Sequence, residues 1–152
     1  MGRSTFLDRF TLINKRRVEL NKKPAAIIFN PYVSGSRGEE ISGLLFEKSV
    51  KNHLMTCEKN MDPYTITNEL DFDQYSAIIA VGGDGTFNQM INGMLARADK
   101  KRLPVGLIPT GQSNDFARSV GLSVDETVAA IEGIAKGEAI AIDTIRVLLD
   151  ND

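Results

Sequence analysis

The chain has very few of the residue types that most often carry redox, metal or nucleophilic chemistry. It contains one cysteine, Cys57, one histidine, His53, and no tryptophan. A single cysteine excludes an internal disulfide and suits a reducing compartment such as the cytoplasm. The spacing of this cysteine and histidine matches no zinc pattern. No Ser-His-Asp or Cys-His catalytic arrangement can be proposed around one isolated histidine.

The chain also lacks an excess of charge of one sign and a long apolar run. Its 18 Lys and Arg residues nearly balance its 20 Asp and Glu residues. This balance creates no overall basic field, so we do not expect a nucleic-acid partner. No apolar run approaches the roughly 20 residues needed to span a bilayer, so we expect no transmembrane segment. The 152 residues are 42% hydrophobic and 25% charged, which predicts one globular domain with a substantial core.

Residues 1–23 form a basic N-terminal segment. Seven of its residues are Lys or Arg, and three apolar residues recur at helical spacing among them. Such a segment is typical of a mitochondrial presequence, of a helix at a membrane surface, or of an exposed basic helix that leads into the domain. The acids Asp8 and Glu19 argue against a presequence, and we favour the exposed helix.

Residues 24–149 alternate short apolar runs with amphipathic stretches and form the predicted domain. The apolar runs predict strands at 25–29, 53–57, 77–81, 104–108 and 139–149. The amphipathic stretches predict helices at 39–52, at 87–95, from about 114, and at 124–136, with a short helical turn near 66–70. Ser123 and Glu126 have the spacing of a capping box, and Gly137 follows the helix. This alternation predicts an α/β fold with an open, mostly parallel sheet and helices on both faces.

Three loops follow predicted strands, at residues 30–38, 82–86 and 109–114. All three are rich in Gly, Ser, Thr or Asn. Ligands of open parallel sheets bind beyond the carboxyl ends of the strands, so we expect the three loops to meet at one ligand site. Taken singly, the first loop could simply end a strand and the third could be a turn with a helix cap.

The second loop, Gly82-Gly83-Asp84-Gly85-Thr86, is the most informative segment. A glycine turn between a strand and a helix lets backbone N–H groups approach a phosphate closely. We expect a positive φ at Gly83, where a side chain would obstruct this approach. A carboxylate beside a phosphate suggests phosphoryl transfer, with Asp84 acting through magnesium or on an attacking hydroxyl. The alternative is that Asp84 only caps a helix.

Taken in order, the motifs resemble one family. They are residues 28–31 (IFNP), 80–93 (AVGGDGTFNQMING) and 106–118 (GLIPTGQSNDFAR). Together they resemble the catalytic domain of diacylglycerol kinases, which sphingosine, ceramide and acylglycerol kinases share. The resemblance covers about residues 24–146. NAD kinases and phosphofructokinases share only the glycine turn, and the pair Asn92-Gly93 with residues 114–118 favours the lipid kinases.

The resemblance implies the NAD kinase/diacylglycerol kinase-like fold, ATP and magnesium as cofactors, and transfer of the γ-phosphoryl group to a lipid hydroxyl at a membrane surface. Asp84 would be the key acid. Asp115 and Asp143 would complete a water-mediated magnesium network, although each has a simpler explanation, as a helix cap and as an acid at a strand end. The residues expected at the nucleotide are Asn30, Pro31, Ser34, Gly82, Gly83, Gly85, Thr86, Gln89, Gly111, Gln112 and Asn114.

Three departures from the family pattern affect these expectations. Gln89 stands where the family usually has Glu, which removes a charge beside the nucleotide. Gln112 and Ser113 replace a smaller pair. The family's second, β-rich domain, which holds much of the lipid site, is absent from this sequence, so we expect a fragment or a short product. It would pair with itself or with that second domain, at the membrane periphery. A non-catalytic nucleotide-binding module and an NAD kinase-type enzyme are the alternative functions.

Overall fold

The protein is an α/β domain built on one parallel sheet. The computed structural model describes residues 7–8, 17–122, 127–145 and 147. Within these residues the main sheet has the strand order β3-β2-β4-β5, and every pairing in it is parallel. Its strands are β2 (Ala25–Phe29), β3 (Asn52–Thr56), β4 (Ala77–Gly82) and β5 (Val105–Pro109). The predicted open, parallel α/β sheet is therefore confirmed.

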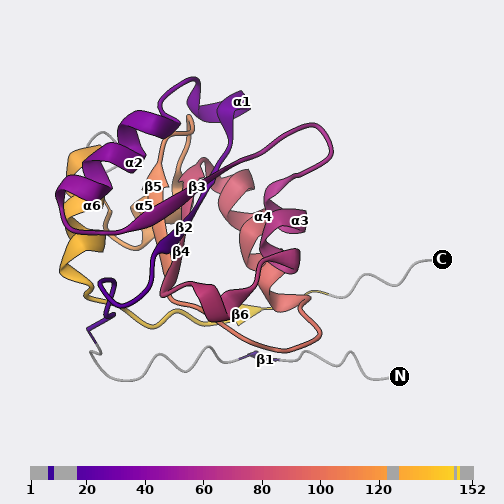
Figure 1. Ribbon diagram of the computed structural model, residues 1–152. Helices are drawn as coiled ribbons and strands as arrows, with labels where there is room; N and C mark the ends of the chain where they lie inside the picture. The colour runs from indigo at the N-terminus through magenta and orange to yellow at the C-terminus, as the bar shows by residue number, and fades with distance from the viewer. Residues whose placement is uncertain (1–6, 9–16, 123–126, 146, 148–152) are drawn as a thin grey trace, which may run out of the picture.

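Helices cover both faces of this sheet, so the domain has three layers (Figure 1). Helices α2 (Gly38–Glu47) and α6 (Thr127–Lys136) lie on one side of it, and α3 (Pro63–Glu69) and α4 (Asp84–Leu95) lie on the other. Three shorter elements connect these parts: α1 (Pro31–Ser34), the 3-10 turn η1 (Phe72–Gln74) and α5 (Asp115–Ser119).

The two central strands are apolar throughout because both of their faces are covered. All residues of β2 and β4 are buried. Alternate residues contribute to two separate cores, since successive side chains of a strand point to opposite faces. Ile27 and Ile79 join the core under α2 and α6, whereas Ile28 and Ile78 join the core under α3 and α4.

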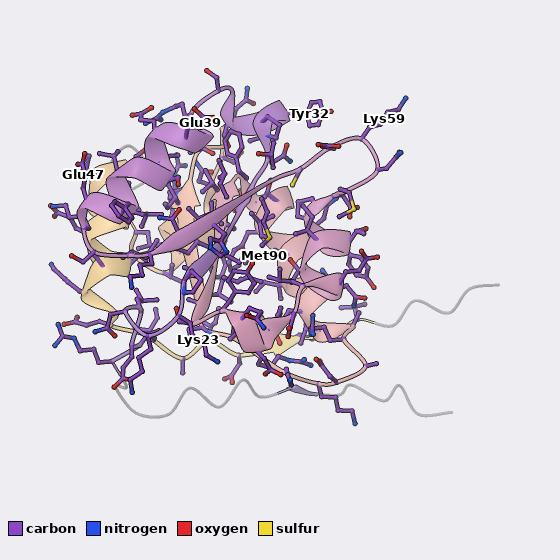
Figure 2. The ribbon with its side chains drawn as sticks, viewed as in Figure 1. Lys23, Tyr32, Glu39, Glu47, Lys59 and Met90 are labelled. Atoms are coloured by element: carbon purple, nitrogen blue, oxygen red, sulfur yellow. The ribbon has the colours of Figure 1, made fainter. Side chains whose placement is uncertain are left out.

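Helix α4 follows the predicted apolar spacing. Phe87, Met90 and Met94 are buried, and Ile91 is partly buried against them. Figure 2 shows Met90 in the interior, whereas Lys23 and Lys59 lie at the periphery. The two methionines therefore serve as core packing, as helical spacing on a buried face indicates.

Two element boundaries differ from the sequence-based expectations. The predicted helix 39–52 ends at Glu47, because Ser49 adopts a left-handed conformation with φ of 64° and the chain then enters β3. The prediction of a strand at 139–149 is wrong for most of the residues that the structure describes in this range. Only β6 (Thr144–Ile145) is a strand, and it pairs antiparallel with β1 (Leu7–Asp8).

The N-terminal segment also differs from the exposed helix that we favoured. Residues 7–8 form β1, and residues 17–23 contain a turn and no helix. Arg17 forms an antiparallel bridge with Glu138, which places this segment beside the end of α6. Most of the basic segment, and the capping box at residues 123–126, lie outside the described residues. Gly137 follows α6 with φ of 66°, which confirms the predicted helix end.

Candidate functional site

The three glycine- and polar-rich loops meet at the carboxyl ends of β2, β4 and β5. Within the sheet, β2 has β3 as one neighbour and β4 as the other. The chain passes from β2 to β3 and then crosses to β4, on the opposite edge of β2. The gap between β2 and β4 is therefore the topological switch point, where open α/β sheets bind their ligands. Asn30 follows β2 and Gly83 follows β4, so the first two loops flank this point. The predicted convergence is confirmed by the hydrogen bonds described next.

Asn30 joins the first loop to the second. Its Oδ1 accepts from the backbone N–H of Tyr32 at 3.1 Å, which caps the short helix α1. Its Nδ2 donates to Thr86 Oγ1, in the first turn of α4, at 3.2 Å. Both ends of this side-chain amide therefore bond within the protein.

Ser34 and Thr110 join the first loop to the third. Their hydroxyl groups form a hydrogen bond with each other. The hydroxyl of Ser34 also donates to the carbonyl oxygen of Val81 at 3.4 Å, and the backbone N–H of Thr110 donates to the carbonyl oxygen of Gly82 at 2.9 Å. Thr110 therefore contacts both other loops, although it was not among the predicted site residues.

Asp84 joins the second loop to α5, the helix that directly follows the third loop. One carboxylate oxygen accepts from the backbone N–H of Asp115 and the other from the backbone N–H of Phe116, each at 2.9 Å. The rings of Phe116 and Phe87 stack beside these bonds, with centroids 4.3 Å apart. Asp84 thus caps the N-terminus of α5. The alternative interpretation placed a cap at its own turn, but no side-chain cap bond forms at the N-terminus of α4.

Asn114 closes the third loop on itself. It is 5% exposed and adopts the left-handed conformation, with φ of 51°. Its Oδ1 accepts from Gly111 N–H at 3.1 Å, and its Nδ2 donates to Gly111 O at 2.7 Å. Asparagine tolerates this conformation better than most residues, because its short side chain can bond locally in this way.

The glycines of these loops permit close approach between backbones. A β-carbon on Gly111 would lie 2.5 Å from Gly83 Cα, and one on Gly82 would lie 2.4 Å from Thr86 Oγ1. Our expectation of a positive φ at Gly83 is wrong, since its φ is −95°. A β-carbon on Gly83 would come within 3.2 Å of Gly111 Cα, a tight contact that favours glycine at this position.

Gly85 differs from its neighbours because the space beside it is empty of protein. A β-carbon added there would meet nothing within 4 Å. Gly85 lies in the first turn of α4, and no side chain caps the N-terminus of this helix. The first N–H groups of a helix have no intrahelical acceptor and carry partial positive charge. An uncapped helix N-terminus behind a glycine turn fits a phosphate group.

The acids predicted to organise magnesium are not all brought together. Asp115 lies beside Asp84, because its backbone N–H donates to the carboxylate of Asp84. Asp143 directly precedes β6, which lies at the end of the domain opposite α1 in Figure 1. Among the described residues, no three His, Cys, Asp or Glu side chains form a group that could hold a metal. Gln89 and Gln112 are exposed.

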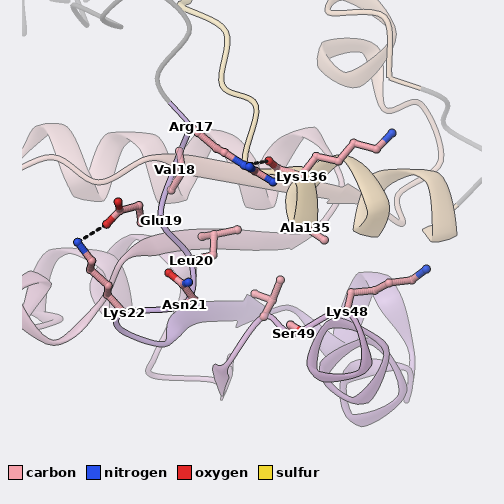
Figure 3. Close-up of a pocket in the computed structure, with 11 residues that line it drawn as sticks. Arg17, Val18, Glu19, Leu20, Asn21, Lys22, Lys48, Ser49, Ala135 and Lys136 are labelled. Atoms are coloured by element: carbon pink, nitrogen blue, oxygen red, sulfur yellow. Dashed lines mark hydrogen bonds and ion pairs between the residues drawn. The ribbon is translucent and has the colours of Figure 1, made fainter.

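A separate hollow lies at the amino ends of the strands, away from the three loops. Its volume is about 560 Å³, and its lining includes Leu20 before β2, Ser49 before β3 and Lys136 at the end of α6 (Figure 3). Several Lys and Arg side chains surround it where α2 and α6 end, which is where cations stabilise helix carboxyl termini. This hollow shares no residue with the three loops.

Comparison with known proteins identifies the family. The model of the diacylglycerol kinase catalytic domain matches residues 24–147. The chain belongs to the diacylglycerol kinase catalytic domain family. It is 36% identical over 128 residues to a diacylglycerol kinase of Bacillus subtilis, across 80% of this chain. It is 26% identical over 155 residues to sphingosine kinase 1 of Arabidopsis thaliana, across 93% of this chain.

A solved structure confirms the fold of this family member. The crystal structure of a diacylglycerol kinase from Bacillus anthracis superposes on 75% of the chain with a TM-score of 0.62 and 24% sequence identity. The chain spans only part of its relatives: 41% of the Bacillus subtilis protein, 31% of the Arabidopsis thaliana protein and 42% of the Bacillus anthracis chain. Among the described residues, no helix combines the length and hydropathy needed to cross a bilayer.

Proposed function

We propose that this chain is the nucleotide-binding part of a lipid kinase, which transfers the γ-phosphoryl group of ATP to a lipid hydroxyl. The observation that carries the proposal is the uncapped N-terminus of α4 at the switch point, with empty space beside Gly85. Membership of a kinase family implies ATP as the phosphoryl donor. The lipid acceptor is inferred from relatives that are named as diacylglycerol and sphingosine kinases.

The phosphates of ATP would lie over the first turn of α4. Backbone N–H groups of residues 84–86 would bind them, because these groups have no intrahelical acceptor. The remaining predicted contacts would come from residues 111–114 on one side and from α1 on the other. Tyr32, on α1, is 77% exposed. In this arrangement Asn30, Ser34 and Asn114 support the loops, because their polar groups bond within the protein.

Asp84 and Asp115 would hold magnesium together with the phosphates. Mg²⁺ is commonly bound through one or two carboxylates plus substrate phosphates and waters, so two acids at this site are sufficient. Bound there, magnesium would offset charge on the phosphate oxygens. We do not extend this role to Asp143, which lies apart. The two N–H bonds to Asp84 hold its carboxylate at the start of α5, and with it the third loop.

We further propose that the acceptor lipid is held mainly by a region that the relatives have and residues 24–149 do not include. The relatives are more than twice as long as the part this chain matches. Phosphoryl transfer depends on positioning the donor and the acceptor together. The 152-residue chain should therefore bind ATP but transfer phosphate poorly. A lipid acceptor and ATP as donor would place the enzyme at the cytoplasmic side of a membrane surface.

A transfer assay tests this proposal. The chain, and a form extended to the length of its relatives if the gene encodes one, would be incubated with γ-labelled ATP and magnesium. Diacylglycerol, monoacylglycerol and sphingosine in mixed micelles would serve as acceptors, with NAD as the alternative acceptor. Label on a lipid supports the lipid kinase, and label on NAD supports an NAD kinase-type enzyme. ATP binding without transfer by either form supports a non-catalytic module.

A further inference from the structure

The hydroxyl pair of Ser34 and Thr110 crosses the sheet at the base of the candidate site. Ser34 ends α1, which follows β2, and Thr110 follows β5, while β4 lies between these two strands. Neighbouring strands are about 4.8 Å apart, so β2 and β5 are separated by roughly 9.5 Å. The two side chains span this separation over the end of β4, where Val81 O accepts from the hydroxyl of Ser34 and Gly82 O accepts from the backbone N–H of Thr110.

The position of this pair determines which parts of the site it connects. Helix α1 forms one side of the site, and a methyl of Val33 lies 3.8 Å from where Gly83 would carry a β-carbon. Residues 111–114 form the other side. The hydroxyl pair connects α1 to Thr110, the residue directly before 111–114. Asn30 instead connects the end of β2 to Thr86 of the central turn, and Asp84 connects that turn to α5, directly after 111–114.

We propose that Thr110 is a positioning residue whose hydroxyl, bonded to Ser34, sets the separation between α1 and residues 111–114 and so the width of the nucleotide site. This inference rests on the proposed function, because the width matters only if a nucleotide binds there. Ser34 is 6% exposed and its hydroxyl donates to Val81 O, so it accepts the hydroxyl hydrogen of Thr110. Without that bond, the third loop loses its side-chain connection to α1.

Four variants isolate the hydroxyl bond from other effects. Thr110→Val removes the hydroxyl, keeps the branched shape and keeps the backbone bond to Gly82. Thr110→Ser keeps the hydroxyl, and Ser34→Ala removes its partner. Thr67→Val is the matched control, because it removes a fully buried threonine hydroxyl that donates to Pro63 O at 2.7 Å in α3, away from the loops.

The affinity of each variant for ATP with magnesium, measured by calorimetry, tests the positioning role. We expect Thr110→Val and Ser34→Ala each to weaken binding about three- to tenfold, which is the range for one lost hydrogen bond. The double variant should bind no more weakly than the weaker single variant, because both remove the same bond. Thr110→Ser should restore the affinity to within about twofold of wild type. Thr67→Val should lower the melting temperature without changing the affinity.

Hydrogen exchange without nucleotide separates failure of this inference from failure of the proposed function. Thr110→Val should speed exchange of the Gly111 amide several-fold and leave β2 amides unchanged. Unchanged exchange, or unchanged ATP affinity in Thr110→Val while the wild type binds ATP, would overturn the positioning role alone. A wild-type chain that does not bind ATP would overturn the proposed nucleotide site, and the role of Thr110 in it.

Discussion

Replacing Gly85 by alanine separates phosphate binding from folding. Apart from Gly85 itself, its two chain neighbours and the adjoining backbone of α4, no atom lies within 4 Å of the added methyl, so the substitution should not clash with the rest of the protein. Alanine in a helix is more favourable than glycine by roughly 0.5–1 kcal/mol, so we expect a melting temperature about 1–4 °C higher than that of the wild type. The methyl would tilt toward the N-terminus of α4. A phosphate oxygen bonded to backbone N–H groups lies only about 2.9 Å from the nitrogen, so the methyl would obstruct it.

We therefore expect Gly85→Ala to weaken ATP binding at least tenfold, which is about 1.4 kcal/mol, while the fold becomes more stable. Calorimetry with ATP and a thermal melt measure the two effects. Gly43→Ala is the matched control, because Gly43 is an exposed glycine inside α2 with nothing within 4 Å of its added β-carbon. It should gain similar stability and keep the wild-type affinity. Equal ATP affinity in both variants would refute a phosphate over this turn.

Three further predictions follow from other parts of the structure. Asp84→Asn should reduce the rate of lipid phosphorylation by a full-length enzyme by roughly two to four decades. It should also lower the free energy of unfolding by about 1–2 kcal/mol, because the amide cannot accept both N–H bonds from α5. Activity within a few-fold of wild type in a folded variant would defeat the assignment of Asp84 as the key acid. Arg97→Lys should lower the free energy of unfolding, measured by chemical denaturation, by about 1–3 kcal/mol, because one guanidinium nitrogen of Arg97 bonds three carbonyl oxygens at the end of α3. Arg37→Lys, the exposed control, should change the free energy of unfolding little. Burial, and secondarily the Asp62 carboxylate, raise the pKa of Cys57 to about 11. Thiol reagents should therefore label the native protein slowly at pH 8, and fast labelling would contradict this. The free energy of unfolding should fall as pH rises from about 9 to 11, because the thiol ionises more readily in the unfolded chain.

The sheet and the meeting of the three loops at the candidate site could be predicted from the sequence, because both follow from local patterns. The all-apolar runs at β2 and β4 indicate strands covered on both faces. The carboxyl ends of parallel strands meet at one edge, so loops that follow those strands must converge. The regular helical spacing of Phe87, Met90 and Met94 similarly identifies the buried face of α4.

The connections within the site could not be predicted, because they join residues that are distant in sequence. Asp84 and Phe116 are 32 residues apart, and Ser34 and Thr110 are 76 residues apart. No local spacing signals either bond. The end of α2 was missed for a different reason: Ser49 adopts a left-handed conformation without being glycine or asparagine. The role of Gly83 was misjudged because close approach and positive φ both select glycine.

An NMR titration of the labelled chain with ATP and magnesium tests whether the nucleotide binds at the glycine turn. We expect the largest amide shifts at residues 82–86, beside the switch point, and at residues 111–114, after the neighbouring strand β5, with small shifts along the middle of β2 and β4. The hollow near Leu20 and Ser49, at the opposite end of the strands, serves as the internal control. Shifts concentrated around that hollow, or no shifts at millimolar ATP, would contradict a nucleotide site at the glycine turn.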